Sequence, residues 1–252
     1  MGDCLARFCD AQGLEDPPLG APVVEAFCVQ GLAGRTNSTK GTYRSVLRRV
    51  GAVDRPRRST PFAGAPAKAP YSATERAALV AIARAQPKAW RGVAALMVVC
   101  LGVGAGLRAG EIAEVACSDV SRDAHRVHVS VRGPRARTTL VEPPFGAMVA
   151  DQVSRAGEGY LFCPGDASRH YHNFINCLCS SLVADPDAPK LSVARSRSSY
   201  ICDQIGRGTS WHEILEATGI KEVESLLRYA RHVEGAPTSK AELRRRLRLE
   251  TR

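Results

Sequence analysis

An arginine directly follows the most apolar stretch of the chain, and this feature most constrains how the chain can fold. Residues 93–103 read VAALMVVCLGV, which predicts a buried helix, and Arg108 comes five residues later, with Glu111 and Glu114 close behind. Burying a guanidinium group costs free energy unless an anion or another acceptor meets it. Two interpretations follow: Arg108 forms an ion pair with Glu111 or Glu114, or its planar fork of donors holds a phosphate.

A second arginine and a tyrosine favour the phosphate. Arg197 lies 89 residues after Arg108, and Tyr229 lies 32 residues after Arg197. With three boxes in this order, at 106–112, 197–208 and 219–229, the chain resembles the tyrosine recombinase (phage integrase) family over about residues 71–233. The resemblance implies that Arg108 and Arg197 hold the scissile phosphate of DNA, and that Tyr229 attacks it to form a 3′-phosphotyrosyl bond.

The residue types suit that chemistry. Fixed cationic donors stabilise the negative charge that gathers on the phosphate oxygens in the transition state. A tyrosine is a weak nucleophile at its usual pKa of about 10, so it needs a cationic setting or a base.

Three supporting positions depart from the family pattern. Arg132 stands at the usual place of a lysine on a β-hairpin, Ala194 at that of a histidine, and Ile220 at that of a histidine or tryptophan. Arginine clamps phosphate well but is a poor proton donor, and neither alanine nor isoleucine can move a proton. Each missing acid–base group costs roughly 10²- to 10⁴-fold in rate, so cleavage is expected to be slow. The sequence offers five candidate substitutes, although such residues are more often surface or helix-capping residues: His170, His172, Trp211, His212 and His232.

The charge of the chain favours a polyanionic partner. The formal net charge is +10, and residues 35–58 carry eight basic side chains against one acidic side chain. A basic run is often only a solvated face, but here two such runs flank the predicted phosphate site, the second beginning at Ser239. We therefore expect contacts with double-stranded DNA from Lys40, Arg44, Arg48, Arg49, Arg57 and Arg58.

The sequence predicts a mainly α fold with a small β-hairpin or sheet (α+β), like the catalytic domain of the family. A short helical domain resembling a core-binding domain spans 1–55, with helical spacing at 3–12, 22–33 and 39–50. A linker rich in proline and alanine spans 56–70, the catalytic domain 71–235 and a basic tail 236–252. Strand-like alternation between 119 and 141 is broken at Gly133, and capping boxes are expected at Ser72, Ser210 and Ser239.

Other classes of protein find little support in the sequence. It contains no repeat, no Walker loop and no acidic cluster with metal-ligand spacing, and its longest apolar run is too short to span a membrane. The nine cysteines are odd in number and several lie in apolar runs, so they are expected to be reduced and mostly buried. The resemblance to tyrosine recombinases implies a cytoplasmic, nucleoid-associated protein of a mobile element or its remnant that forms homo-oligomers on DNA, without cofactor or metal. Two functions remain: a recombinase with a divergent active site, or a catalytically impaired DNA-binding protein of the same fold.

Overall fold

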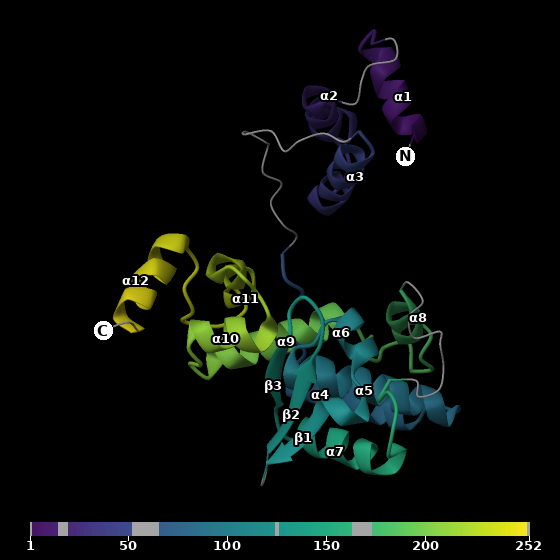
Figure 1. Cartoon of the computed structure of the whole chain (residues 1–252), viewed down its shortest axis with the longest axis vertical. Coiled ribbons are helices and arrows are strands. Elements are labelled where there is room, and N and C mark those ends of the chain that lie inside the picture. Colours follow the sequence, from purple (N-terminus) through teal and green to yellow (C-terminus); the bar gives the residue numbers. More distant parts are fainter. Residues whose placement is uncertain (1, 15–19, 52–65, 124–125, 163–172, 251–252) are drawn as a thin grey trace. The chain divides into compact units, whose positions relative to one another are not determined.

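The computed structural model describes residues 2–14, 20–51, 66–123, 126–162 and 173–250, apart from the side chains of residues 248–250. It divides into unit 1 (Met1–Pro66) and unit 2 (Ala67–Arg252), which are drawn in Figure 1. Most of the predicted linker lies outside the described residues. Its last four residues, 67–70, belong instead to unit 2, because their backbone carbonyl groups accept hydrogen bonds from that unit.

Unit 1 is helical, as its sequence pattern predicts. Its core consists of buried side chains from successive helices, among them Phe27 and Leu47. The Thr36 side chain accepts a hydrogen bond from the backbone N–H of Thr39 and so begins the third helix. The elements are α1 (Gly2–Ala11), α2 (Ala21–Ala26), the π-helical continuation η1 (Phe27–Gly31) and α3 (Asn37–Val50).

In unit 2 the apolar helix α5 (Ala89–Ala105) lies at the centre. It packs against α4 (Ala73–Arg84), α7 (Phe145–Ala156) and α9 (Val193–Gly206). Because α5 has neighbours on several sides, its apolar side chains are buried on several faces of the helix. A continuous apolar run in the sequence predicts this arrangement. The remaining helical elements are α6 (Ala109–Glu114), η2 (Cys117–Asp119), α8 (Phe174–Ser180), α10 (Trp211–Thr218), η4 (Val223–Leu226), α11 (Leu227–Ala230) and α12 (Lys240–Glu250).

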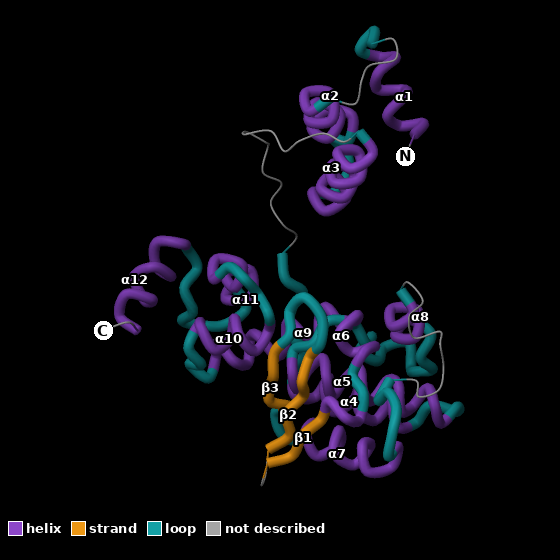
Figure 2. Tube along the Cα trace, viewed as in Figure 1, coloured by secondary structure: helices purple, strands orange, loops and turns teal. Residues whose placement is uncertain are grey.

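The predicted hairpin is part of a three-stranded antiparallel sheet in the order β1-β2-β3, which Figure 2 shows in orange. The strands are β1 (Val120–Asp123), β2 (Arg126–Val131) and β3 (Arg137–Val141). Val127, Val129 and Val131 are buried, so the alternation read from the sequence marks the face of β2 that joins the core. Helix α7 packs on this sheet. The predicted α+β class is therefore confirmed.

Glycines on α5 allow α9 and α7 to lie close against it. A Cβ atom added at Gly102 would lie 2.7 Å from Cβ of Ser196, and one at Gly104 would lie 2.7 Å from Cβ of Phe145. Side chains at these two glycines would therefore push the neighbouring elements apart. This close packing brings Arg197, next to Ser196 on α9, to the carboxyl end of α5.

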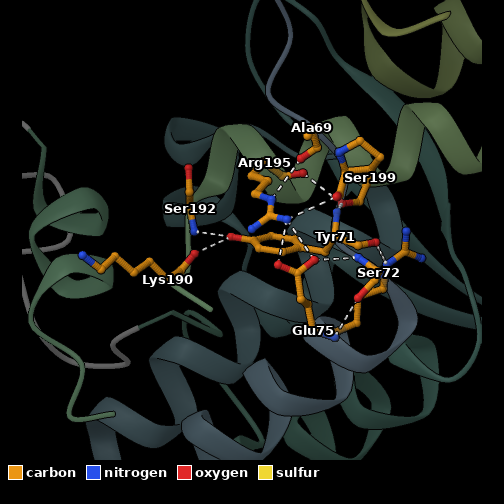
Figure 3. Close-up of polar contacts among 10 residues, drawn as sticks. Ala69, Tyr71, Ser72, Glu75, Lys190, Ser192, Arg195 and Ser199 are labelled. Atoms are coloured by element: carbon orange, nitrogen blue, oxygen red, sulfur yellow. Dashed lines mark hydrogen bonds and ion pairs between the residues drawn. The ribbon is translucent and has the colours of Figure 1, made fainter. Parts of the chain in front are cut away.

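Polar contacts around Tyr71 link the first residues of unit 2 to α9 (Figure 3). The Arg195 guanidinium lies 4.1 Å from the centre of the Tyr71 ring and donates to both carboxylate oxygens of Glu75 at 2.8 Å. The Tyr71 hydroxyl donates to the Lys190 carbonyl at 2.6 Å, and the Ser199 hydroxyl accepts from the Tyr71 backbone N–H at 2.7 Å. The entry into unit 2 is thus fixed to the helix that carries Arg197.

The predicted helix starts are confirmed at all three serines. Ser72 and Ser210 form complete capping boxes, and Ser239 accepts from the backbone N–H of Glu242 at 3.2 Å. The segment around Tyr229 is not one continuous helix. It consists of the short elements η4 and α11, which end at Ala230.

The cysteines that the structure describes are free thiols, six of them buried. Burial raises the pKa of Cys100 and of Cys179 to about 12, so both thiols stay protonated at neutral pH. Within the described ranges, no helix has both the length and the hydropathy needed to cross a membrane. Among the same residues, no group of His, Cys, Asp and Glu side chains could hold a metal ion.

Candidate active site

Arg197 is the buried centre of the candidate site. The residue is 7% exposed, and its guanidinium donates to the Gly106 carbonyl and, at 2.7 Å, to the Thr218 carbonyl. Gly106 ends α5 in the left-handed conformation, and Thr218 is the last residue of α10. Two helices therefore present carbonyl groups at their carboxyl ends to one arginine. The partial negative charge of these helix ends favours the cationic guanidinium.

Tyr229 lies beside this arginine. Burial lowers the pKa of Arg197 below its ordinary value, while the neighbouring Tyr229 and Glu111 act to raise it, Tyr229 also through a side-chain hydrogen bond. Tyr229 itself is 9% exposed, and the guanidinium carbon of Arg228 lies 5.2 Å from the centre of its ring. The structure thus brings together Arg197 and Tyr229, two residues that the sequence motifs single out.

Glu111 joins the first motif to the second. Its Oε2 accepts from the backbone N–H of Arg108 at 2.9 Å and lies 4.0 Å from Nη1 of Arg197. Both carboxylate oxygens also accept hydrogen bonds from Arg137, at 2.9 and 3.0 Å. The sequence suggests an ion pair of Arg108 with Glu111 or Glu114, but in the structure Glu111 pairs with Arg137.

The motif analysis missed Arg137. It lies at the first position of β3, and its side chain is 7% exposed. The signal available in the sequence was the trio of hairpin arginines at 132, 135 and 137, any of which could pair with the glutamate after Arg108. Only the folded hairpin decides which one does.

Arg108 lines a pocket of about 600 Å³ together with Arg132 and Arg135. Its backbone is extended where α6 begins, directly after the tight turn at Gly106 and Leu107. The pocket also receives Glu111 and Glu114 from the same helix. A concave surface lined by three arginines suits an anion with several oxygen atoms.

Arg132, at the usual lysine position, is held by Asp119. Its Nη2 lies 2.6 Å from Oδ1 of Asp119, and its Nε donates to the same oxygen at 2.8 Å. Asp119 is 8% exposed, whereas the Arg132 side chain is 56% exposed. The guanidinium therefore stays at the mouth of the pocket with part of its charge already paired.

The other two positions that depart from the family pattern, Ala194 and Ile220, lie at the edges of the site. Ala194 is exposed on α9, one turn before Arg197. Ile220 is half-buried and lines a second pocket of about 460 Å³ with Arg135 and Arg137. Arg135 therefore lines both pockets, and the space next to Ile220 is bordered by cationic side chains.

Three of the candidate substitutes for the missing histidines lie within the described residues, and they contact groups other than Arg197. Trp211 is buried in a hydrophobic cluster, and the His212 side chain is 80% exposed, with Nε2 3.3 Å from Glu216. The His232 ring contacts the Ala67 carbonyl at 3.1 Å. His170 and His172 lie outside the described residues.

The expected DNA-binding residues of unit 1 fall into three groups. Arg44 and Arg48 pair with Glu25 at 3.0 and 2.5 Å, with side chains only 11% and 14% exposed, so they hold α3 to α2 instead of lying on an open surface. Packing of α3 on α2 turns them inward, and the sequence alone does not show this. Lys40 is half-buried and Arg49 exposed, while Arg57 and Arg58 lie outside the described residues.

No protein-family model matches the chain, and no curated protein sequence matches it either. Solved structures of site-specific recombinases and integrases do match it, over nearly its whole length, and the chain has the tyrosine recombinase fold. The predicted fold family is thereby confirmed at the level of the fold.

Three of these structures show how far the similarity extends. The XerH site-specific recombinase, in a post-cleavage complex with a palindromic difH substrate, is 12% identical; the match covers 98% of this chain and 76% of XerH with a TM-score of 0.59. The Tn1549 transposon integrase, in complex with transposon right end DNA, is 12% identical over 99% of this chain and 92% of its own, also with a TM-score of 0.59. A lambda integrase dimer bound to a COC′ core site is 15% identical over 94% of this chain and 90% of its own, with a TM-score of 0.51.

Proposed function

We propose that this protein is a site-specific DNA strand transferase, a tyrosine-type recombinase or integrase acting on double-stranded DNA. Arg108 and Arg197 hold the scissile phosphate, Tyr229 is the nucleophile, and Arg132 stands at the mouth of the phosphate pocket. Several copies of the chain assemble on the DNA, as exchange between two duplexes requires more than one cleavage. The reaction needs no cofactor or metal.

The chemical step balances without an external energy source. The Tyr229 oxygen forms a bond to phosphorus, the bond from phosphorus to the 5′-oxygen breaks, and the tyrosine proton is lost while the 5′-oxygen gains one. The 3′-phosphotyrosyl bond conserves the energy of the phosphodiester. A 5′-hydroxyl of the same or another strand then reverses the step and releases Tyr229.

The observation that carries this proposal is the pairing of Arg197 with Tyr229. A buried guanidinium, fixed by two helix-end carbonyl groups, lies next to a tyrosine 32 residues along the chain. A cation held in advance beside the nucleophile can stabilise charge on phosphate and favour the phenolate.

The proposal predicts a covalent protein–DNA adduct at Tyr229. The preferred duplex site is first selected from random sequences, then prepared with a nick that traps the cleaved product. We expect an adduct that survives denaturing electrophoresis and a phosphotyrosyl peptide containing Tyr229 in mass spectrometry. Tyr229→Phe should abolish the adduct with DNA affinity changed less than about threefold, because only the nucleophilic oxygen is lost.

Arg197→Lys is the matched test of the phosphate contact. Lysine keeps the positive charge but loses the bidentate hydrogen-bond donor of the guanidinium, so the adduct should form much more slowly. An adduct on another residue, or one that persists in Tyr229→Phe, would contradict the proposal.

A second candidate function is supported by Ala194, Ile220 and the Asp119 partner of Arg132. Ala194 and Ile220 lack the side-chain groups to which the family resemblance assigns proton transfer. Asp119 pairs with Arg132, which stands at the third such position. A protein of this fold without efficient chemistry would act as an accessory or regulatory DNA-binding protein. Binding to a selected site with no adduct on the nicked substrate would favour this second function.

DNA binding by unit 1 is tested through Arg49, because Arg44 and Arg48 are paired with Glu25. Each phosphate contact contributes about 0.9 to the slope of log affinity against log salt concentration, so Arg49→Ala should flatten the slope by about that amount. Arg155→Ala on α7 serves as control, since this side chain is 72% exposed and pairs only with nearby Asp151 in the structure. Equal slopes for Arg49→Ala and the wild type would exclude Arg49 from the DNA surface.

A further inference from the structure

We infer that Arg137 is the counter-ion of Glu111 and thereby leaves Arg197 available to an anion. Arg137 is thus a positioning residue of the phosphate site and not itself a phosphate ligand. This inference rests on the proposed phosphate site, although it does not require that DNA is cleaved.

The first step of the argument is that the donors of Arg137 are already occupied. It donates to both oxygens of Glu111, to the Ala217 carbonyl at 2.7 Å and to the Arg135 carbonyl at 3.1 Å. An arginine has five N–H donors, so these four bonds leave one. A side chain bound in this way cannot turn its planar fork towards a phosphate.

The second step is that Glu111 stands between two buried arginines. The Arg137 side chain is 7% exposed and that of Arg197 is 8% exposed, with the Glu111 side chain at 13%. Glu111 lies within direct bonding distance of Arg137 but 4.0 Å from the nearest nitrogen of Arg197. Because both oxygens already accept from Arg137, the carboxylate neutralises that arginine first.

The third step is the charge that remains. Arg137 and Arg197 bring two positive charges to this cluster, and Glu111 brings one negative charge. Without Arg137, a partly buried carboxylate would have Arg197 as its nearest cation, and such charges pair strongly when water is excluded. Glu111 would then compete with any phosphate for Arg197.

The local backbone supports the placement of Arg137. Gly219 ends α10 in the left-handed conformation, and a Cβ atom there would lie 3.2 Å from Nη1 of Arg137 and 3.3 Å from Cβ of Arg135. The end of α10 thus lies close against the arginine, and a side chain at Gly219 would make tight contacts with it. Strand β3, helix α6 and the end of α10 are joined through this one side chain.

The test measures binding of inorganic pyrophosphate to the full-length chain by isothermal titration calorimetry. Arg137→Met should weaken binding by about tenfold, equivalent to about 1.4 kcal/mol, because Glu111 then pairs with Arg197. Glu111→Gln should not weaken binding, since the competing charge is gone while the amide oxygen can still accept from Arg108. The double variant Arg137→Met with Glu111→Gln should return to within about threefold of the wild type.

This rescue separates a charge effect from a structural one, because the double variant lacks the ion pair entirely. Arg76→Met breaks another half-buried ion pair of unit 2, with Asp203, and is the matched control expected to leave affinity unchanged. Failure of the double variant to recover, or weaker binding by Glu111→Gln, would overturn the inference. Glu111→Gln still provides this test where Arg137→Met does not fold.

Arg197→Met identifies where pyrophosphate binds and should abolish the signal. Wild-type protein that binds no pyrophosphate through Arg197 overturns both the phosphate site and the role of Arg137. Binding and rescue without any Tyr229 adduct contradict only the proposed strand transfer.

Discussion

Introducing histidine at both Ala194 and Ile220 is expected to raise the rate of DNA cleavage by at least about 10²-fold, since each general acid–base group contributes roughly 10²- to 10⁴-fold. Ala194 is exposed one turn before Arg197, so a histidine there can lie on the same face of α9. Ile220 lines the pocket that also contains Arg135 and Arg137. The measurement is the single-turnover rate of adduct formation on the nicked site.

The matched control replaces the same two residues with glutamine, which can form hydrogen bonds but cannot titrate. The histidine variant should show a change in rate centred near pH 6.5, the ordinary pKa of histidine, and the glutamine variant should not. Tyr229→Phe in the histidine background should again give no adduct. Equal rates for the two variants would show that proton transfer at these positions does not limit the reaction.

The same experiment decides between the two functions considered above. An adduct formed slowly by the wild type and quickly by the histidine variant indicates a working enzyme with a weakened acid–base set. An adduct formed only by the histidine variant identifies the natural protein as a DNA-binding protein whose chemistry has been lost.

Features that depend on local sequence could be predicted without the structure. Capping at Ser72 and Ser210 involves residues three positions apart, and the alternation in β2 needs only one buried face. Motif spacing, a signal that spans most of unit 2, also predicts that Arg197 and Tyr229 lie close together.

The choice of ion-pair partners could not be predicted in this way. Glu111 pairs with Arg137, 26 residues away, and Arg48 pairs with Glu25, 23 residues away. In each case several arginines could compete for the carboxylate, and tertiary packing decides which of them pair with it. Arg44 and Arg48 therefore looked like surface residues in the sequence, although packing of α3 on α2 buries them.

Gly106→Ala is expected to destabilise unit 2 by about 2–5 kcal/mol, since a left-handed backbone costs an L-residue about 1–2 kcal/mol and overpacking a core about 1–3 kcal/mol. Gly106 has a φ of +64°, and a Cβ atom there would lie 2.4 Å from Cδ1 of the buried Tyr200 ring. The melting temperature should fall by about 5 °C or more at roughly 2–4 °C per kcal/mol. Differential scanning calorimetry of the full-length chain measures this change.

Gly110→Ala provides the matched comparison within the same motif. Gly110 lies in α6, where a Cβ atom would meet nothing within 4 Å, so alanine should stabilise the helix by about 0.5–1 kcal/mol. The two substitutions add the same methyl group four residues apart with opposite expected signs. Equal changes in melting temperature for the two variants would mean that the turn at Gly106 does not lie in close contact with Tyr200.

The Gly106 substitution should also reach the candidate site, because the Gly106 carbonyl accepts a hydrogen bond from Arg197. If the turn moves away from Tyr200, that carbonyl moves with it, and Arg197 loses one of its two fixed acceptors. Pyrophosphate binding by Gly106→Ala should therefore be weaker than that of the wild type even well below the melting temperature. Gly110 lines the pocket of Arg108 but lies outside this turn, so Gly110→Ala should weaken binding less than Gly106→Ala does. The pair of variants shows whether Gly106 serves to place Arg197.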